Sequence, residues 1–193
     1  NIMKKIGILD ILFEKNVETK FFKKLLLIEK KNSITTNQTL RFVSLAPNAN
    51  KNHLSELKMF NFSKKDKKKL LLLTNQEFKI DNKMKNNDIK RILYSIDKKL
   101  FIDLAILSWV LSANKTLNKD WRYIISQISK LNSPIFPLKA LDLLSFGLKE
   151  GPIIGEIFSQ IEKEWIDSNF ALNKEELLQK SKAIIDTKDH NIS

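Results

Sequence analysis

Residues 137–165 read PLKALDLLSFGLKEGPIIGEIFSQIEKEW, and this stretch decides how the end of the chain folds. It holds three of the four glycines, at positions 147, 151 and 155, in a chain that is otherwise poor in glycine and proline. Such clustering marks turns, because glycine adopts backbone conformations that other residues avoid. The stretch therefore predicts a short helix, a tight hairpin and a long amphipathic helix.

The first helix of this hairpin is predicted to begin at Pro137, because a missing N–H costs nothing in a first helical turn. Gly147 would end the helix as its C′ residue. The second helix is predicted to begin with Gly151 as N-cap and Pro152 at its first position, and Gly155 would let another backbone approach closely. The apolar stripe of the first helix would consist of Leu138, Leu141, Leu144 and Leu148.

The start of the second helix is also a candidate anion site. Backbone N–H groups that follow Gly151, from Ile153 onward, could hold a phosphate with help from the helix dipole and from Lys149. The alternative is that the glycines only allow two helices to pack. Spacing favours this alternative, because glutamates at positions 150 and 156 would repel an anion.

Composition and periodicity predict an all-α protein. Hydrophobic residues make up 42% of the 193 residues, glycine and proline are scarce, and strand-type alternation is absent. We expect a multi-helix array of about ten short helices, with an elongated helical body over residues 1–132 and a helical tail over residues 133–193.

The formal charge of +12 is unevenly distributed along the chain. Residues 1–141 hold 28 Lys and Arg against 12 Asp and Glu, a net of +16, whereas residues 142–193 hold 6 against 10, a net of −4. A basic body joined to a mildly acidic tail predicts a polyanionic partner on the body, and nucleic acid is the foremost candidate. The alternative is a solvated basic surface, because frequent Lys and Asn also reflect genomic base composition.

Several classes of site and location are excluded or disfavoured by the sequence. Absence of cysteine excludes disulfides and thiol–zinc sites, and the two histidines lie far apart without neighbouring ligands. No apolar run approaches a membrane span and no convincing signal peptide is present, so a cytoplasmic location is expected. There is no phosphate-binding glycine loop, no Asp-x-Asp pair and no nucleophile–histidine arrangement. We therefore expect no catalytic residue, metal site or cofactor in this chain.

Apolar periodicity places most of the remaining helices. The helix over residues 98–111 is apolar nearly all round, which predicts a central buried helix. Ser63 is predicted to be the N-cap of another helix, with Asp66 three residues later. The three tryptophans are expected to be packing anchors rather than base-stacking platforms. Further helices are predicted over residues 2–13, 17–28, 36–45, 53–60, 88–96, 121–131 and 174–185, the last capped by Asn173.

The lysines that follow Ser63 are the main candidates for phosphate binding. Lysines in a first helical turn oppose the helix dipole by a few tenths of a kcal/mol each. This small cost makes sense if a phosphate backbone lies nearby and releases counterions on binding. The alternative is a solvated lysine-rich face. The candidates are Lys64, Lys65, Lys67 and Lys68, together with Arg91.

The tail sequence resembles a known family. Residues 137–178 look like the C-terminal tail of bacterial CCA-adding tRNA nucleotidyltransferases, the family that includes bacterial poly(A) polymerases. Residues 7–13, 41–47, 57–70 and 91–109 are similar to the helical regions that precede this tail, in the same order. Ala140 and Phe146 depart from the usual Gly and Leu. The matching residues are Pro137, Leu138, Asp142, Leu143, Gly147, Leu148, Gly151, Pro152, Gly155, Glu156, Trp165 and Ile166.

This resemblance implies an RNA-holding region. In the family, a head with a metal-binding aspartate pair performs catalysis and a neck selects the nucleotide, and neither is found in these residues. The chain would be the body and tail that hold tRNA or another RNA, as part of a longer protein or a split gene product. Magnesium and ATP or CTP would belong to the head, and nucleotide addition by this chain alone is not expected. The alternative is a helical adaptor that docks on a separately encoded catalytic subunit or another protein.

Overall fold

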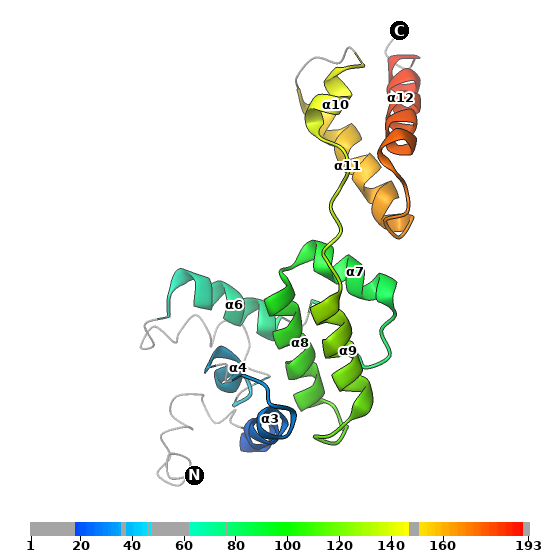
Figure 1. Ribbon diagram of the computed structural model, residues 1–193. Helices are drawn as coiled ribbons and strands as arrows, with labels where there is room; N and C mark the ends of the chain where they lie inside the picture. The colour runs from blue at the N-terminus through cyan, green and yellow to red at the C-terminus, as the bar shows by residue number, and fades with distance from the viewer. Residues whose placement is uncertain are drawn as a thin grey trace. The chain divides into compact units, whose positions relative to one another are not determined.

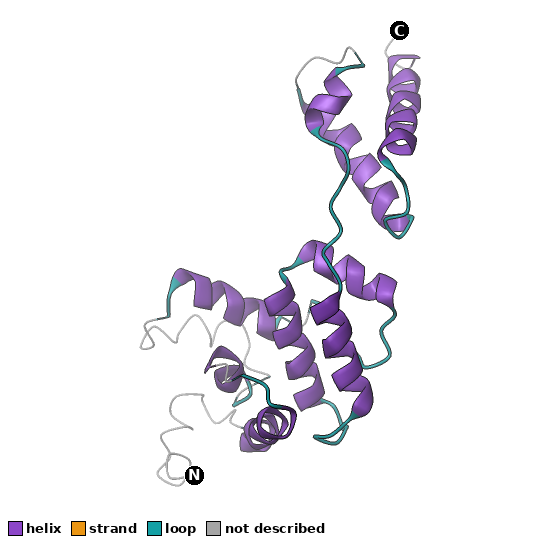
Figure 2. Ribbon diagram, in the orientation of Figure 1, coloured by secondary structure: helices purple, strands orange, loops and turns teal. Residues whose placement is uncertain are grey.

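The computed structural model describes residues 18–35, 38–45, 47, 62–75, 77–146 and 151–190. In these ranges the chain forms nine helices and no strand, which confirms the all-α prediction. Figure 2 colours the helices purple and the connecting loops teal. The chain divides into two compact units between Leu131 and Asn132. The helices predicted over residues 2–13 and 53–60 lie outside the described residues, as do Gly147, Leu148 and Lys149.

Unit 1, the part of the chain up to Leu131, is built around helix α8. Nine of the 14 residues of α8 are buried, and α3, α6, α7 and α9 all pack on it, which confirms the predicted central helix (Figure 1). The bounds of α8 are also as predicted. The helices in the described residues of unit 1 are α3 (Thr19–Asn32), α4 (Gln38–Val43), α6 (Lys64–Thr74), α7 (Asn86–Ser95), α8 (Lys98–Leu111) and α9 (Lys119–Lys130).

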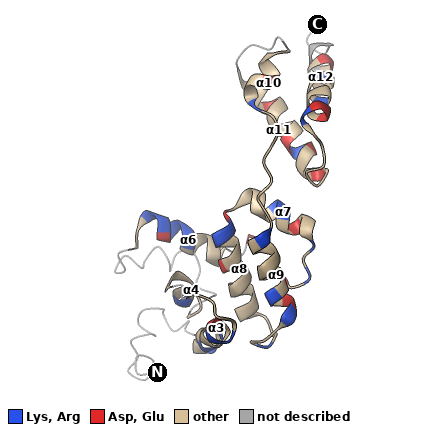
Figure 3. Cartoon of the chain, viewed as in Figure 1, with Lys and Arg blue, Asp and Glu red and all other residues tan. Residues whose placement is uncertain are grey.

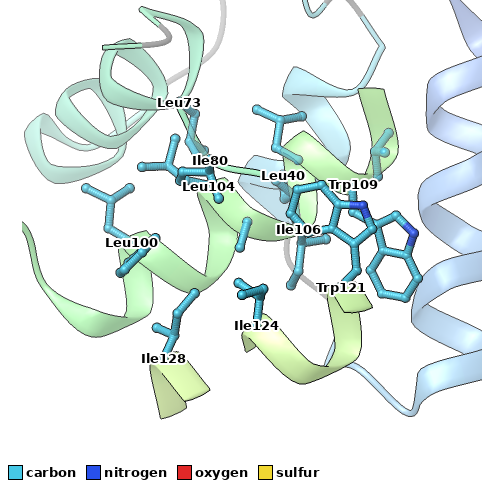
Figure 4. Packing of buried hydrophobic residues seen from close by; sticks show 14 of the residues in the cluster. Leu40, Leu73, Ile80, Leu100, Leu104, Ile106, Trp109, Trp121, Ile124 and Ile128 are labelled. Atoms are coloured by element: carbon cyan, nitrogen blue, oxygen red, sulfur yellow. The ribbon is translucent and has the colours of Figure 1, made fainter. Parts of the chain in front are cut away.

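Two tryptophans join α8 to α9 in the core. The indole rings of Trp109 and Trp121 stack with centroids 6.5 Å apart and planes 10° apart (Figure 4). Both indole N–H groups are satisfied although the rings are buried, because Trp109 donates to the carbonyl of Lys115 at 2.9 Å and Trp121 to Oδ1 of Asn114 at 3.0 Å. The tryptophans therefore act as packing anchors, as predicted for aromatic residues with one polar edge.

Side-chain caps fix where three helices of unit 1 begin. Ser63 accepts the backbone N–H of Asp66 at 3.1 Å, as predicted for the start of α6. In the same way, Asp97 caps α8 and Asn118 caps α9, each accepting a backbone N–H at 2.9 Å. Each cap satisfies one of the donors that a helix leaves unpaired in its first turn, which is worth about 1 kcal/mol.

Two buried carboxylates of unit 1 form ion pairs between helices. Asp103, which interrupts the apolar sequence of α8, lies 2.5 Å from the ammonium of Lys69 on α6. On α3, the 6% exposed Glu29 accepts Nε and Nη2 of Arg41, from α4, at 3.0 and 2.6 Å. Removing one partner of such a pair leaves a buried charge without compensation, so both pairs constrain how their helices meet.

Unit 2, from Asn132 onward, has three helices in its described residues, α10 (Ala140–Leu144), α11 (Pro152–Asp167) and α12 (Lys174–His190). Gly151 is the N-cap of α11 and Pro152 its first residue, as predicted. Asn173 caps α12 by accepting two backbone N–H groups, and the helix continues five residues beyond its predicted end. The third tryptophan, Trp165, is buried against the rings of Phe136 and Phe170.

The predicted start of the first hairpin helix and the predicted inward position of Leu141 are wrong, whereas Leu138 of the same stripe is buried. Helix α10 begins at Ala140 rather than Pro137, because the carboxylate of Asp142 accepts the N–H of Lys139 at 2.6 Å and makes Lys139 the N-cap. This start turns the fully buried Leu143 inward and leaves Leu141 72% exposed. Gly155 is not a site of close backbone approach either, since among the described residues no atom outside its own stretch of helix backbone lies within 4 Å of the position that a Cβ would take.

The carboxylate of Asp142 should make unit 2 sensitive to acid. A hydrogen bond from Lys174 of α12, at 2.7 Å, and a second from the backbone N–H of Lys139 hold the pKa of Asp142 below its ordinary value of 3.8. A carboxyl with a lowered folded-state pKa stabilises the fold above its unfolded pKa, and this stabilisation disappears as pH falls through the folded-state pKa. We expect Asp142→Asn to lower the urea midpoint at neutral pH and to reduce the further loss on acidification below about pH 4.

The midpoint is measured by helical circular dichroism at both pH values. The control variant is Asp167→Asn, which changes the charge of the same unit at an exposed position. If Asp142→Asn and the wild-type chain lost the same stability on acidification, the ion pair between Asp142 and Lys174 would not contribute to the acid sensitivity of unit 2.

Candidate nucleic-acid interface

The lysines at the start of α6 form an exposed basic face, which we call the α6 lysine face. Its four residues are all exposed, whereas the fifth lysine of the helix, Lys69, is held by Asp103. Lys64 and Lys68 are four residues apart and therefore lie on one side of the helix, away from the buried Leu70. Figure 3 shows this basic end of α6 at a distance from α8. The α6 lysine face consists of Lys64, Lys65, Lys67 and Lys68.

The local electrostatics of α6 favour an anionic partner. The helix begins at Lys64, so its first turn carries positive side chains next to the positive end of the helix dipole. The single carboxylate in this turn, that of Asp66, accepts a hydrogen bond from the hydroxyl of Ser63 at 2.6 Å. One carboxylate cannot balance four lysines, and a bound phosphate backbone would relieve this repulsion.

Arg91 lies in a second basic surface, a shallow depression of about 380 Å³ beside α7. Two carboxylates also line the depression, but each accepts a backbone N–H of the loop: Asp81 from Lys83 at 2.7 Å and Asp88 from Lys85 at 3.1 Å. Three of the cations belong to the segment between α6 and α7, and the density of lysine in that segment is the sequence signal that could have found this surface. The cationic residues that line the depression are Lys79, Lys83, Lys85 and Arg91.

The structure does not gather the predicted phosphate-binding residues into one site. Helices α6 and α7 both pack on α8, but Figure 1 shows them extending to different sides of it. The α6 lysine face and the depression around Arg91 are therefore separate surfaces of unit 1. Gly151 and Ile153 belong to unit 2.

The start of α11 offers fewer backbone donors than the sequence predicted. The N–H of Ile154 donates to the carbonyl of Gly151 at 3.2 Å, so this donor is used within the first turn. Gly151 is exposed and Ile153 is half-buried. The α6 lysine face therefore provides more charge for an anion than the start of α11.

Searches for other features and for relatives give negative results. Within the described ranges, no group of three or more His, Cys, Asp or Glu side chains is placed to hold a metal ion. None of the helices α3 to α12 described above is long and apolar enough to cross a membrane. No family model matches the chain, and a search of curated proteins finds no match.

Proposed function

We propose that this chain is a cytoplasmic RNA-holding region related to the body and tail of CCA-adding tRNA nucleotidyltransferases and poly(A) polymerases. It would hold tRNA, or another folded RNA, while a catalytic head outside these residues acts on the 3′ end. The observation that carries this proposal is the α6 lysine face, four exposed cations within two helical turns. All four side chains are exposed, whereas the neighbouring Lys69 is held by the buried carboxylate of Asp103.

The charge of unit 1 supports an RNA partner. Residues 1–131 hold 27 Lys and Arg against 12 Asp and Glu, a net of +15, whereas residues 132–193 hold 7 against 10, a net of −3. Lysine is a compact charge on a flexible stem, so it contacts phosphates without reading a base sequence. A surface of this kind would bind the phosphate backbone, which all folded RNAs share.

The salt dependence of tRNA binding tests the proposal. With four phosphate contacts, the affinity should fall about 100-fold between about 50 mM and about 200 mM salt, because each contact releases condensed counterions. Fluorescence anisotropy of labelled tRNA measures the affinity at both concentrations. A helical adaptor for another protein would show little affinity for tRNA at either concentration, and that outcome would overturn the proposal.

A further inference from the structure

A third basic surface of unit 1 is a pocket where the end of α3 meets α9. Its cavity volume is about 420 Å³, and none of its eight lining residues is acidic. Lys31 and Arg122 supply two positive charges, and two serines supply hydroxyls. In the described part of the chain, neither cation forms an ion pair. The lining residues are Lys31, Asn32, Ser33, Ile34, Trp109, Arg122, Ile125 and Ser126.

Hydrogen bonds at the end of α3 hold this pocket in place. The amide of Asn32 donates to the carbonyl of Ile28 at 2.9 Å and to that of Thr116 at 3.0 Å, which joins α3 to the loop before α9. Ser33 ends the helix in the left-handed conformation, with φ 53° and ψ 37°. Lys31 therefore lines the same pocket as Arg122, although the two residues are far apart in sequence.

The chemistry of the pocket suits a phosphate beside an apolar surface. A guanidinium group binds phosphate oxygens through two parallel hydrogen bonds, and a lysine adds a second charge. The half-buried Ile34 and Ile125 supply the accessible apolar part of the lining, whereas Trp109 behind them is fully buried. A nucleotide combines the same two properties, a phosphate group and an apolar ring face.

The exposed face of α9 continues from this pocket. Lys119, Arg122, Tyr123, Ser126 and Lys130 each lie three or four residues from another member of the set, so they share one side of the helix. This side is opposite the buried isoleucines of α9. The ring of Tyr123 is 58% exposed, which is unusual for a large aromatic residue on a helix with a well-packed inner face. An exposed aromatic ring among cations is the arrangement on which unpaired bases stack.

We infer that the pocket and Tyr123 together bind one unpaired nucleotide of an RNA. Lys31 and Arg122 hold its phosphate, and its base stacks on the ring of Tyr123, which lies outside the pocket lining but neighbours the lining residue Ser126, three residues along the helix. This site rests on the proposed function, because it assumes an RNA partner. It adds a preference that lysines alone do not provide: single-stranded segments bind here and continuous duplexes do not.

Substitutions of Tyr123 and Arg122 test this site. The probe is a labelled oligouridine of about ten nucleotides, measured by anisotropy beside a blunt RNA duplex. Tyr123→Ala should weaken oligouridine binding about tenfold, whereas Tyr123→Phe, which keeps the ring, should stay within about twofold of wild type. Arg122→Gln should weaken binding about fivefold and reduce the slope of log affinity against log salt by about one. Both side chains are exposed, so the fold should tolerate these changes.

The two RNA probes separate failure of this site from failure of the proposed function. If both variants bound oligouridine as tightly as wild type while wild type still bound tRNA, the nucleotide site would be wrong and the proposed function would stand. Equal losses on duplex and oligouridine for Tyr123→Ala would also overturn the stacking. A wild-type chain that bound neither tRNA nor oligouridine at low salt would overturn both.

Discussion

Replacing the four residues of the α6 lysine face by glutamine should lower the affinity for tRNA by about 100-fold at physiological salt, because four phosphate contacts are lost. Glutamine is nearly as good a helix former as lysine, so α6 should remain intact. The variant should even be slightly more stable, since lysines of the first turn oppose the helix dipole. Anisotropy measures the affinity, and urea unfolding measures the stability.

A matched variant distinguishes direct contacts from the effect of net charge. It replaces four other exposed lysines by glutamine, namely Lys23, Lys30, Lys163 and Lys182. Its net charge falls by the same amount, but the affinity for tRNA should fall less than about tenfold. Equal losses for the two variants would mean that the α6 lysine face attracts RNA only as part of the total charge. Lys69 stays unchanged in both, because its loss would leave Asp103 buried without its partner.

Trp109→Ala should reduce the free energy of unfolding of unit 1 by about 4 kcal/mol. The side chain is fully buried, and its loss removes the stacking with Trp121 and leaves a large cavity in the core. It also removes the donor for the carbonyl of Lys115. Small domains are stable by only about 5–15 kcal/mol, so a substantial unfolded fraction is expected at moderate urea concentrations. Urea unfolding followed by circular dichroism measures the change.

The control for this prediction is Leu117→Ala, which truncates a large side chain at a position that is 53% exposed. Its free energy of unfolding should stay within about 0.5 kcal/mol of wild type, because little apolar area leaves the core. A small effect of Trp109→Ala, comparable with that of Leu117→Ala, would contradict the central place of α8 and α9 in the core.

Features that depend on local sequence were predicted well. The bounds of α8 follow from a long apolar segment between Asp97 and Ser112, and the caps Ser63 and Asn173 follow from single residues that accept nearby N–H groups. The exposure of the α6 lysine face also follows from its position in one amphipathic helix.

Features that depend on distant contacts were missed. Helix α10 is five residues long, too short for a periodic pattern to reveal that Leu143 rather than Leu141 is buried. Its start depends on Asp142, whose carboxylate is also held by Lys174 from another helix. Lys31 and Arg122 meet on one pocket only because α3 and α9 are folded together. No local pattern in the sequence indicates that residues so far apart in the chain lie close together in the fold.

The ion pair between Lys69 and Asp103 fixes the direction in which the other lysines of α6 point. If α6 shifted by one residue along its axis, Lys68 or Leu70 would replace Lys69 opposite the buried carboxylate. A leucine there would leave Asp103 uncompensated, and Lys68 there would bring an exposed cation of the α6 lysine face inward. The carboxylate in α8 therefore selects one helical register, and the outward orientation of the four remaining ammonium groups follows from that choice.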